Sequence, residues 1–505
     1  MICSCCKAEE NDVIENTGIQ TSPVDSNGGD DDDVSVYYDA VANLDDRQSM
    51  VASTSTTSPE IFHSAVGALH NNNRRRSIND STQQRHHRKS ITQLLLLRQS
   101  ATAADLQGGY PGHLTEKQLQ ICLDFRKQIT SDDDNDDGVD NSTRREIVFA
   151  FHKIENEAYA ICRYLRAREF DIEATLKMID GYIPRWKEGR EHNFYPDFKA
   201  VTNHNGDESA LLSQFPLVIG GLAKNGCLIL YFTVKHLSLD GIECVANLEK
   251  IGPYMWYLVL QKYVNEVQRR QTDDPSVKIR PVQVLVVADL DGLQLLTLRR
   301  AMPALQTALG ILSVFPEFLY SVVICNVPRF FNAFWRIIKT FLDPSTANKF
   351  ELYSKRSIGQ KRLSELIHPV QLASNFGGTA ISTDDLSLRQ LEGCTRQIVH
   401  LVKCTPGGIG QCVVSITENE NATINVYTKC SCEATFSIDS DTKIFTLKRT
   451  DKESTNDPYF REKVASLRGK GDYRATIKMG DNSSPSFFLV VVLVKEEENW
   501  VDNPM

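Results

Sequence analysis

The sequence lacks the features of a membrane-spanning or secreted chain. No apolar run reaches the roughly 18 residues that a bilayer-spanning helix needs. The N-terminus, MICSCCKAEENDVIENTG, has no basic start followed by a long apolar stretch, so it does not resemble a signal peptide. The odd count of 13 cysteines does not suggest a disulfide framework. We therefore expect a cytoplasmic protein with reduced thiols.

The sequence also lacks the marks of nucleic-acid binding and of catalysis. A net charge of −9 argues against general nucleic-acid binding. No dinucleotide-binding glycine fingerprint, P-loop, zinc-protease helix or nucleophile elbow is present. The glycine-rich segment PGGIGQC precedes an apparent strand, so it predicts a hairpin and no phosphate site. An enzyme is therefore the least favoured function class, and we expect no metal and no organic cofactor.

Residues 1–110 are rich in Ser, Asp, Asn and Thr and show no sustained periodicity. Such a segment buries too little apolar surface to offset its ordering entropy, so we predict a disordered tail. Ser77 and Ser90 follow basic residues and are candidate phosphorylation sites, although a solvated basic run explains the same pattern. Further on, SDDDNDDGVDNST begins like a calcium loop. Arg144 stands where a bidentate Glu is required, so we predict an acidic loop without calcium.

From His113 the pattern becomes that of a folded α/β domain. LTEKQLQICLDFRKQI has an N-cap at Thr115 and predicts the first of several helices. The segments 227–234, 282–290 and 321–327 are nearly continuous apolar runs, which is typical of strands covered on both faces in a parallel sheet. The helical segment between the last two is long enough for a right-handed crossover.

The C-terminal region, 392–497, has the pattern of an all-β domain. Segments such as GQCVVSITE, DYRATIKM and SFFLVVVLVKEE alternate or run apolar, and Asn, Asp and Gly separate them. This spacing predicts a β-sandwich.

An aromatic helix follows the third predicted strand, in RFFNAFWRIIKTFLDPSTANKF. At about 100° per residue, one broad face collects Phe330, Phe331, Phe334, Trp335, Ile337, Ile338, Phe341 and Leu342. Asp343-Pro344 is expected to end the helix, because the residue before a proline disfavours the α region. Core packing is one interpretation of this face. An amphipathic lid over an apolar ligand or against a membrane is the other.

Several motifs resemble, in order and spacing, the CRAL-TRIO family of lipid-binding proteins. They are LTEKQLQICLDFRKQI, AICRYLRAREFDIEATLKMI, VVADLDGLQL, VICNVPRFFNAFWRIIKTFLDP, STANKF and HPVQLASNFGGT, and they span about 113–380. The C-terminal β region resembles a GOLD domain, and the pair is similar to the supernatant protein factor and tocopherol-associated group. The expected organisation is a tail over 1–110, a helical lead-in over 113–190, a lipid-binding domain over 200–380 and a GOLD-like sandwich over 392–497.

The resemblance implies that the aromatic helix is a mobile gate over a lipid pocket. The residues expected at the pocket and gate are Phe330, Phe334, Trp335, Ile338, Phe341 and Leu342. Arg168, Thr346 and Lys349 match positions that hold a phosphoinositide head group in yeast relatives. Glu169 and Phe318 replace basic residues of that site, and Val284 and Val286 replace hydroxyls that meet phosphatidylcholine. The ligand implied is phosphatidylinositol or an isoprenoid such as tocopherol or squalene.

Two functions of different classes remain open. The first is a non-enzymatic lipid carrier or sensor that makes transient membrane contact and binds a protein partner through the GOLD-like domain. The second is a signalling or trafficking adaptor that acts through the GOLD-like domain, with the lipid in a structural role. Neither involves nucleic acid.

Overall fold

The computed structural model describes most of the chain after the N-terminal tail. The described residues are 108–131, 141–202, 207–389, 391, 393–429, 434–438, 441–447, 460–481 and 485–496. The predicted tail up to residue 107, with Ser77 and Ser90, and the acidic loop before Asn141 lie outside them.

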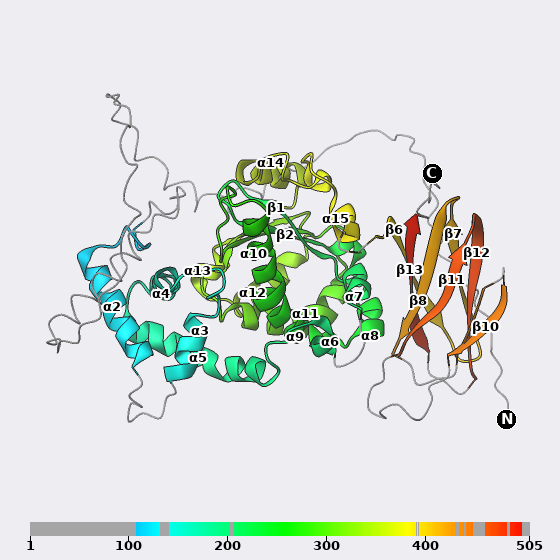
Figure 1. The fold of residues 1–505 in the computed structure, drawn as a ribbon, viewed down its shortest axis with the longest axis horizontal. Coiled ribbons are helices and arrows are strands. Elements are labelled where there is room, and N and C mark those ends of the chain that lie inside the picture. Colours follow the sequence, from blue (N-terminus) through cyan, green and yellow to red (C-terminus); the bar gives the residue numbers. More distant parts are fainter. Residues whose placement is uncertain are drawn as a thin grey trace, which may run out of the picture. The chain divides into compact units, whose positions relative to one another are not determined.

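Four helices form the lead-in to the α/β domain (Figure 1). They are α2 (Glu116–Thr130), α3 (Asn141–Val148), α4 (Glu157–Arg166) and α5 (Ile172–Glu191). The predicted N-cap is confirmed, because the Thr115 hydroxyl accepts from the Gln118 amide and the Gln118 side chain accepts from the Thr115 amide. This capping box satisfies two amides that the helix itself leaves without partners.

The α/β domain is built on a five-stranded sheet of order β1-β2-β3-β4-β5. Its strands are β1 (Leu217–Leu222), β2 (Leu228–Thr233), β3 (Val284–Asp289), β4 (Leu319–Cys325) and β5 (Phe350–Leu352). The three predicted strands are confirmed as β2, β3 and β4, which pair in parallel. Strand β5 extends the parallel sheet, and β1 joins the other edge antiparallel. The sequence analysis missed these two edge strands.

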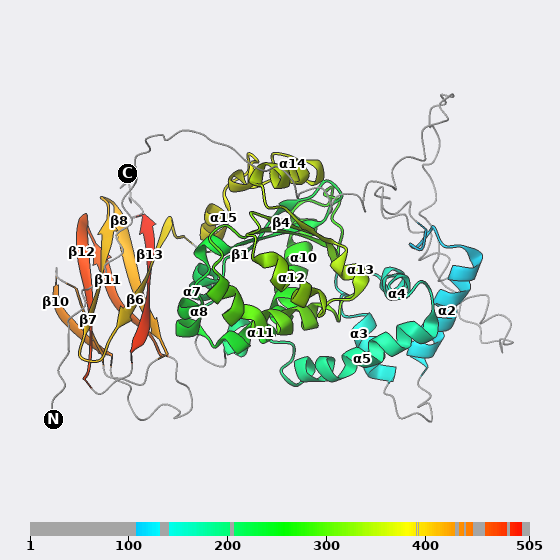
Figure 2. The same cartoon turned by 180° about the vertical axis from the view of Figure 1, so that it is seen from behind.

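Helices cover both faces of this sheet, as Figures 1 and 2 show. They are α6 (Phe198–Thr202), α7 (Glu208–Gln214), α8 (Leu239–Val245), α9 (Ile251–Tyr257), the π-helix η3 (Leu258–Tyr263), α10 (Val264–Asp273), α11 (Leu295–Leu312), α12 (Phe331–Lys339), α13 (Pro344–Ala347), α14 (Arg356–Leu366) and α15 (Thr383–Arg389). Short 3-10 turns lie at Val234–His236, Leu248–Lys250 and Ser374–Phe376.

The two faces of the sheet bury separate apolar clusters. On one face, Tyr231, Leu285 and Val287 pack with Leu363 of α14 and with Ile367. On the other face, the remaining strand side chains join a larger cluster with α9, η3, α11, α12 and the lead-in helices. A sheet covered on both faces explains the continuous apolar runs of the sequence.

The aromatic helix is shorter than the sequence predicts. Helix α12 ends at Lys339, with Thr340 as its C-cap, and a turn follows before Pro344 begins α13. Phe341 and Leu342 therefore lie in this turn, half-buried against the large cluster.

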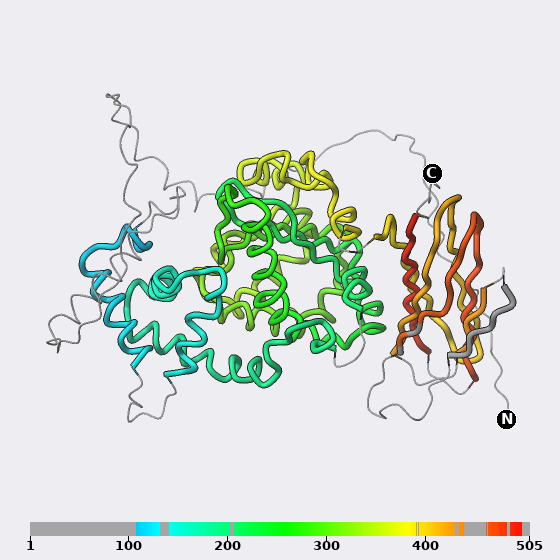
Figure 3. Tube along the Cα trace, in the orientation of Figure 1, coloured from blue at the N-terminus to red at the C-terminus, as the bar shows by residue number. Residues whose placement is uncertain are grey.

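The C-terminal region is the predicted β-sandwich, seen as the orange-to-red end of the trace in Figure 3. One sheet has the order β10-β9-β12-β7 and the other β11-β8-β13-β6. The strands are β6 (Arg396–Cys404), β7 (Ile409–Ile416), β8 (Glu420–Thr428), β9 (Ala434–Ile438), β10 (Asp441–Leu447), β11 (Phe460–Arg468), β12 (Gly471–Met479) and β13 (Ser486–Glu496). Strand β11 was not predicted from the sequence.

The sandwich has a core of its own, in which the inward side chains of both sheets meet. Val414, Phe436 and Val490 are among the residues fully enclosed there. Tyr427, Leu489 and Val491 face the other way and belong to the large cluster of the α/β domain.

A buried ion pair within the lead-in fixes Arg163, which also contacts the α/β domain. Arg163 binds Glu155 through its guanidinium at 2.8 Å, and the two side chains are only 3% and 6% exposed. The same guanidinium donates to the Pro316 carbonyl at 3.2 Å, and the neighbouring Tyr164 hydroxyl donates to the Val314 carbonyl at 3.0 Å. Glu155 raises the pKa of Arg163 against the effect of burial, so the charge persists.

Glu155→Gln should destabilise the fold by about 3–5 kcal/mol, because Arg163 would remain buried without a compensating charge. The measurement is the free energy of unfolding from urea titration. The matched control is Glu418→Gln, which breaks the exposed pair with Lys470 at 3.6 Å and should cost less than about 1 kcal/mol. Equal small losses in both variants would show that the Arg163 pair does not hold the lead-in in place.

Candidate functional site

An enclosed cavity of about 40 Å³ lies on the face of the sheet that α9, η3 and α11 cover. It is lined by Ile219, Leu228, Leu230, Met255, Leu258, Val259, Tyr263, Val284, Val286, Leu312, Phe318 and Leu319. These side chains come from strands β1 to β4, from the three helical segments and from the residue just before β4. The cavity therefore lies inside the α/β domain, between the sheet and its helical cover.

Strand alternation explains why β3 contributes two valines to this cavity. Successive side chains of a strand point to opposite faces, so Val284 and Val286 face the cavity while Leu285 and Val287 face α14. Val284 and Val286 are the residues that stand in place of the phosphatidylcholine-binding hydroxyls expected from the family. The replacement makes this wall apolar.

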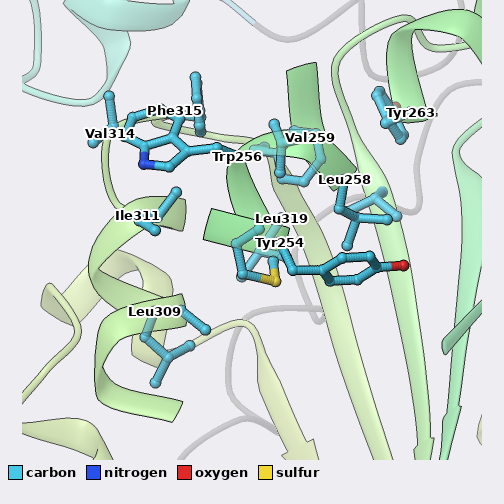
Figure 4. Close-up of a cluster of buried hydrophobic side chains, with 14 of the residues drawn as sticks. Tyr254, Trp256, Leu258, Val259, Tyr263, Leu309, Ile311, Val314, Phe315 and Leu319 are labelled. Carbon is cyan, nitrogen blue, oxygen red and sulfur yellow. The ribbon is translucent and has the colours of Figure 1, made fainter. Parts of the chain in front are cut away.

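The helical wall comes from α9 and the π-helix that follows it. Figure 4 labels Leu258, Val259 and Tyr263 of this segment together with Leu319 of β4, which faces them. A π-helical turn has more residues per turn than an α-helix, and such turns occur frequently at functional sites. Here it brings three side chains of six consecutive residues to the cavity wall.

The lining offers no group for acid–base or nucleophilic chemistry. The Tyr263 hydroxyl donates to the Gln283 carbonyl at 3.0 Å. Burial raises the pKa of Tyr263, so the phenol stays neutral. The other lining side chains are aliphatic residues, Met255 and Phe318. The arrangement suits an apolar ligand.

The cavity is small compared with sites for organic ligands, which typically have volumes of about 300–1,000 Å³. A long-chain lipid therefore fits only if parts of the wall move apart. The surrounding helices are the elements able to move, since β2, β3 and β4 are each paired with a strand on both sides.

The predicted gate residues lie in the apolar cluster that surrounds the cavity. Trp335 and Ile338 of α12 are buried, while Phe330, Phe334, Phe341 and Leu342 are half-buried against this cluster. None of these six lines the enclosed cavity itself. The α12 face therefore covers the core beside the cavity, and the Trp335 ring packs 4.9 Å from that of Phe350 in β5.

The prediction is wrong for one residue of the aromatic face, Ile337. Ile337 is 49% exposed, together with Arg336 and Lys339 on the outer side of α12. Phe331, which was also predicted on this face, is buried as expected. Successive helix positions lie about 100° apart, so Ile337 points more than about 100° away from the middle of the face that Phe331, Trp335 and Ile338 bury.

The three predicted head-group residues gather around one carboxylate, that of Asp343. The Thr346 hydroxyl donates to Asp343 at 2.7 Å. Burial opposes ionisation, yet hydrogen bonds from Ser345 and Thr346 lower the pKa of Asp343, and the Arg168 guanidinium acts in the same direction. Burial lowers the pKa of Lys349, while the carboxylates of Glu317 and Asp343 act to raise it. The sequence analysis did not identify this carboxylate.

Each predicted head-group residue also has a partner within the protein. Lys349 donates to the carbonyl of Leu319, a cavity-lining residue, at 2.7 Å. Arg168 donates to the carbonyl of Ala167 at 2.7 Å. The cluster thus holds two cations, Arg168 and Lys349, near the Asp343 carboxylate, and its polar side chains already have partners within the protein.

The cavity-lining residues that come from α9 and η3 were not predicted from the sequence. Met255, Leu258, Val259 and Tyr263 lie in YMWYLVLQKY, an apolar run that indicates burial. The run has no period that distinguishes a cavity wall from ordinary core packing.

Comparison with known proteins identifies the domain that holds this cavity. Residues 212–378 match the CRAL/TRIO domain family. This segment contains the whole sheet and every residue of the cavity wall. Residues 212–378 are a CRAL/TRIO domain. The family was expected from the sequence motifs, and the match confirms it for this segment.

Three curated relatives share the region. The CRAL-TRIO domain-containing protein T23G5.2 of Caenorhabditis elegans is 27% identical over 241 residues, which are 46% of this chain and 31% of that protein. The phosphatidylinositol/phosphatidylcholine transfer protein SFH12 of Arabidopsis thaliana is 25% identical, covering 46% and 41%. The alpha-tocopherol transfer protein-like protein of Mus musculus is 26% identical, covering 45% and 60%. The chain thus spans less than two thirds of each of these relatives.

No helix among the described residues is long and apolar enough to cross a membrane. Within the same residues, no group of His, Cys, Asp and Glu side chains is arranged to hold a metal ion.

Val286→Ile should leave the stability unchanged or raise it by up to about 1 kcal/mol, because the added methylene fills the cavity of the CRAL/TRIO domain. The matched control is Val287→Ile, on the opposite and fully packed face of β3, which should cost about 1–3 kcal/mol. Urea unfolding of both variants measures the difference. Equal losses would mean that the cavity is not available to the longer side chain.

Proposed function

We propose that this protein binds a hydrophobic lipid inside its CRAL/TRIO domain and transfers it between membranes without catalysing a reaction. The observation that supports this proposal is the enclosed, wholly apolar cavity between the sheet and η3. Homologues with lipid-transfer names share this part of the chain, which supports a lipid ligand rather than a cofactor.

Burial of apolar surface supplies the binding energy in this proposal. Each methylene removed from water contributes about 0.8 kcal/mol, so a long hydrocarbon chain binds tightly without any covalent step. The ligand enlarges the cavity by displacing the surrounding helices, and α12 serves as the gate. Its outer residues Arg336, Ile337 and Lys339 remain exposed and can meet a membrane surface, since basic and apolar side chains together favour one.

The arrangement near α13 favours a neutral lipid over a phosphoinositide. Lys349 and Thr346 already bind Leu319 and Asp343, and the Asp343 carboxylate adds a negative charge to this cluster that would repel a phosphate. An isoprenoid such as tocopherol or squalene requires no such charge. Phosphatidylinositol remains the alternative ligand, since Arg168 and Lys349 are both near this site.

The sandwich supports a second function, that of an adaptor. It has its own core, as a separate binding module requires. Strand β7 exposes Ile409 at 61% and Val413 at 48% on its outer face. We propose that this GOLD-like sandwich binds a protein partner, with signalling or trafficking as the process served.

Phe334→Asp should abolish lipid uptake while the fold survives, because the introduced charge would lose hydration wherever α12 closes over the ligand. The measurement is transfer of a fluorescent tocopherol analogue between vesicles. The matched control is Asn332→Asp, which places the same charge on the exposed side of the same helix and leaves the proposed membrane-facing residues unchanged. It should keep uptake within about twofold, since its side chain does not face the core.

Loss of cooperative unfolding in Phe334→Asp would instead mark α12 as a fixed part of the core. Full uptake by a folded Phe334→Asp protein would rule out α12 as the gate.

Lys349→Ala tests the head-group alternative. If the site near α13 binds phosphate, transfer of phosphatidylinositol should fall about tenfold or more, because a charge-assisted contact contributes about 1.5–3 kcal/mol. Transfer of tocopherol should be nearly unchanged. Glu169→Lys should strengthen phosphatidylinositol binding by removing the negative charge beside Arg168. Equal loss of both ligands in Lys349→Ala would show that Lys349 serves the fold through its bond to Leu319.

A further inference from the structure

Two thiols meet between the lead-in helices α2 and α4, outside the cavity and the gate. The Sγ atoms of Cys122 and Cys162 lie 3.9 Å apart, and both cysteines are free. They are separated by 40 positions in the sequence, so this contact exists only because α2 packs on α4. The odd cysteine count did not suggest a disulfide framework, and nothing in the sequence indicated this pair.

The two thiols differ in their access to solvent. Cys122 is 8% exposed and Cys162 is 1% exposed. Arg166 follows Cys162 by one helical turn on α4, and its guanidinium is near both sulfur atoms. This guanidinium is fixed by Glu317 and lies 3.7 Å from the centre of the Tyr110 ring. A small oxidant therefore reaches Cys122 first, beside a fixed positive charge.

The directions of the pKa shifts, like the exposure, make Cys122 the more reactive of the two thiols. The hydrogen bond from Cys162 lowers the pKa of Cys122 against the effect of burial, and Arg166 acts in the same direction. The same hydrogen bond, together with burial, raises the pKa of Cys162. Thiolates are the reactive form of cysteine, so Cys122 is the nucleophile of the pair.

We propose that Cys122 and Cys162 form a peroxide-sensitive dithiol whose oxidised form is a disulfide between α2 and α4. The sulfur atoms must approach from 3.9 Å to the bond length of about 2.05 Å, which rotation of the two side chains and a slight shift of the helices can provide.

The oxidation proceeds in two balanced steps. The Cys122 thiolate attacks one oxygen of hydrogen peroxide, so an S–O bond forms, the O–O bond breaks and the departing hydroxide takes up a proton as water. The Cys122 sulfenic acid is then attacked by the Cys162 sulfur. The S–S bond forms, the S–O bond breaks and a second water leaves with the Cys162 proton. Two thiols and one peroxide give one disulfide and two waters.

The disulfide would crosslink α2 and α4 of the lead-in. A crosslink across 40 positions restricts the unfolded chain, so the oxidised protein should be the more stable form. Reduction by a thiol restores the free pair, which makes the change reversible.

Peptide mapping of the full-length protein tests the proposal. The protein is treated with a few equivalents of hydrogen peroxide, remaining thiols are blocked with N-ethylmaleimide, and tryptic peptides are identified by mass spectrometry. We expect a Cys122–Cys162 linked peptide that disappears after reduction. Cys227 is fully buried, with its pKa raised by burial to about 12, and should stay reduced and unlinked.

Thermal unfolding of the unmutated protein provides a second measurement. Peroxide treatment should raise Tm by on the order of 5 °C, and reduction should reverse the shift. Cys162→Ser should abolish both the linked peptide and the Tm shift. In this variant Cys122 should be either oxidised beyond the sulfenic acid or labelled with the maleimide. The proposal is overturned if both cysteines of the unmutated protein carry the maleimide after peroxide treatment. It is also overturned if Cys122 reaches the sulfinic acid without forming a link.

Discussion

The parallel strands β2, β3 and β4 are apolar on both faces, and this single constraint determines the architecture around them. Helices must cover both sides of the sheet to keep these side chains from water. On the side of α14, the side chains of Leu285 and Val287 are completely enclosed. On the other side, the cover leaves a space of about 40 Å³. The proposed function depends on this difference. A ligand can push the helices away from the face that already has a cavity more readily than from the face that is fully packed.

The same constraint explains how much of the fold could be predicted. Strands buried on both faces appear as continuous apolar runs, so β2, β3 and β4 were evident. The edge strand β1, LVIGGL, has two glycines in its centre, which weaken any strand pattern. Strand β5 has only three residues, too few for a period. The sandwich was recognisable from several strands, although β11 was missed.

The site could be predicted only in part. The family motifs directed attention to Val284, Val286 and the aromatic helix, and strand alternation placed both valines on the cavity wall. The partners of these valines come from η3, about 25 positions earlier, and only tertiary packing brings them together. Motif matching likewise placed Lys349 in a head-group site. It could not show that Asp343 is at the centre of the cluster, since hydrogen-bond partners are set by the folded arrangement. Core packing and a lid, the two interpretations of the aromatic helix, are compatible, because α12 packs on the core in this conformation and leaves it only in the proposed open state.

The central claim is that the CRAL/TRIO domain holds one neutral hydrophobic lipid within its enlarged cavity. Native mass spectrometry of the full-length protein, purified without detergent from its own cells, tests this claim most directly. The account predicts one lipid per chain, which on release is identified as a neutral isoprenoid. Release of phosphatidylinositol instead would contradict the neutral ligand class. A protein that remains free of lipid after incubation with vesicles containing tocopherol, squalene and phosphatidylinositol would contradict the claim itself.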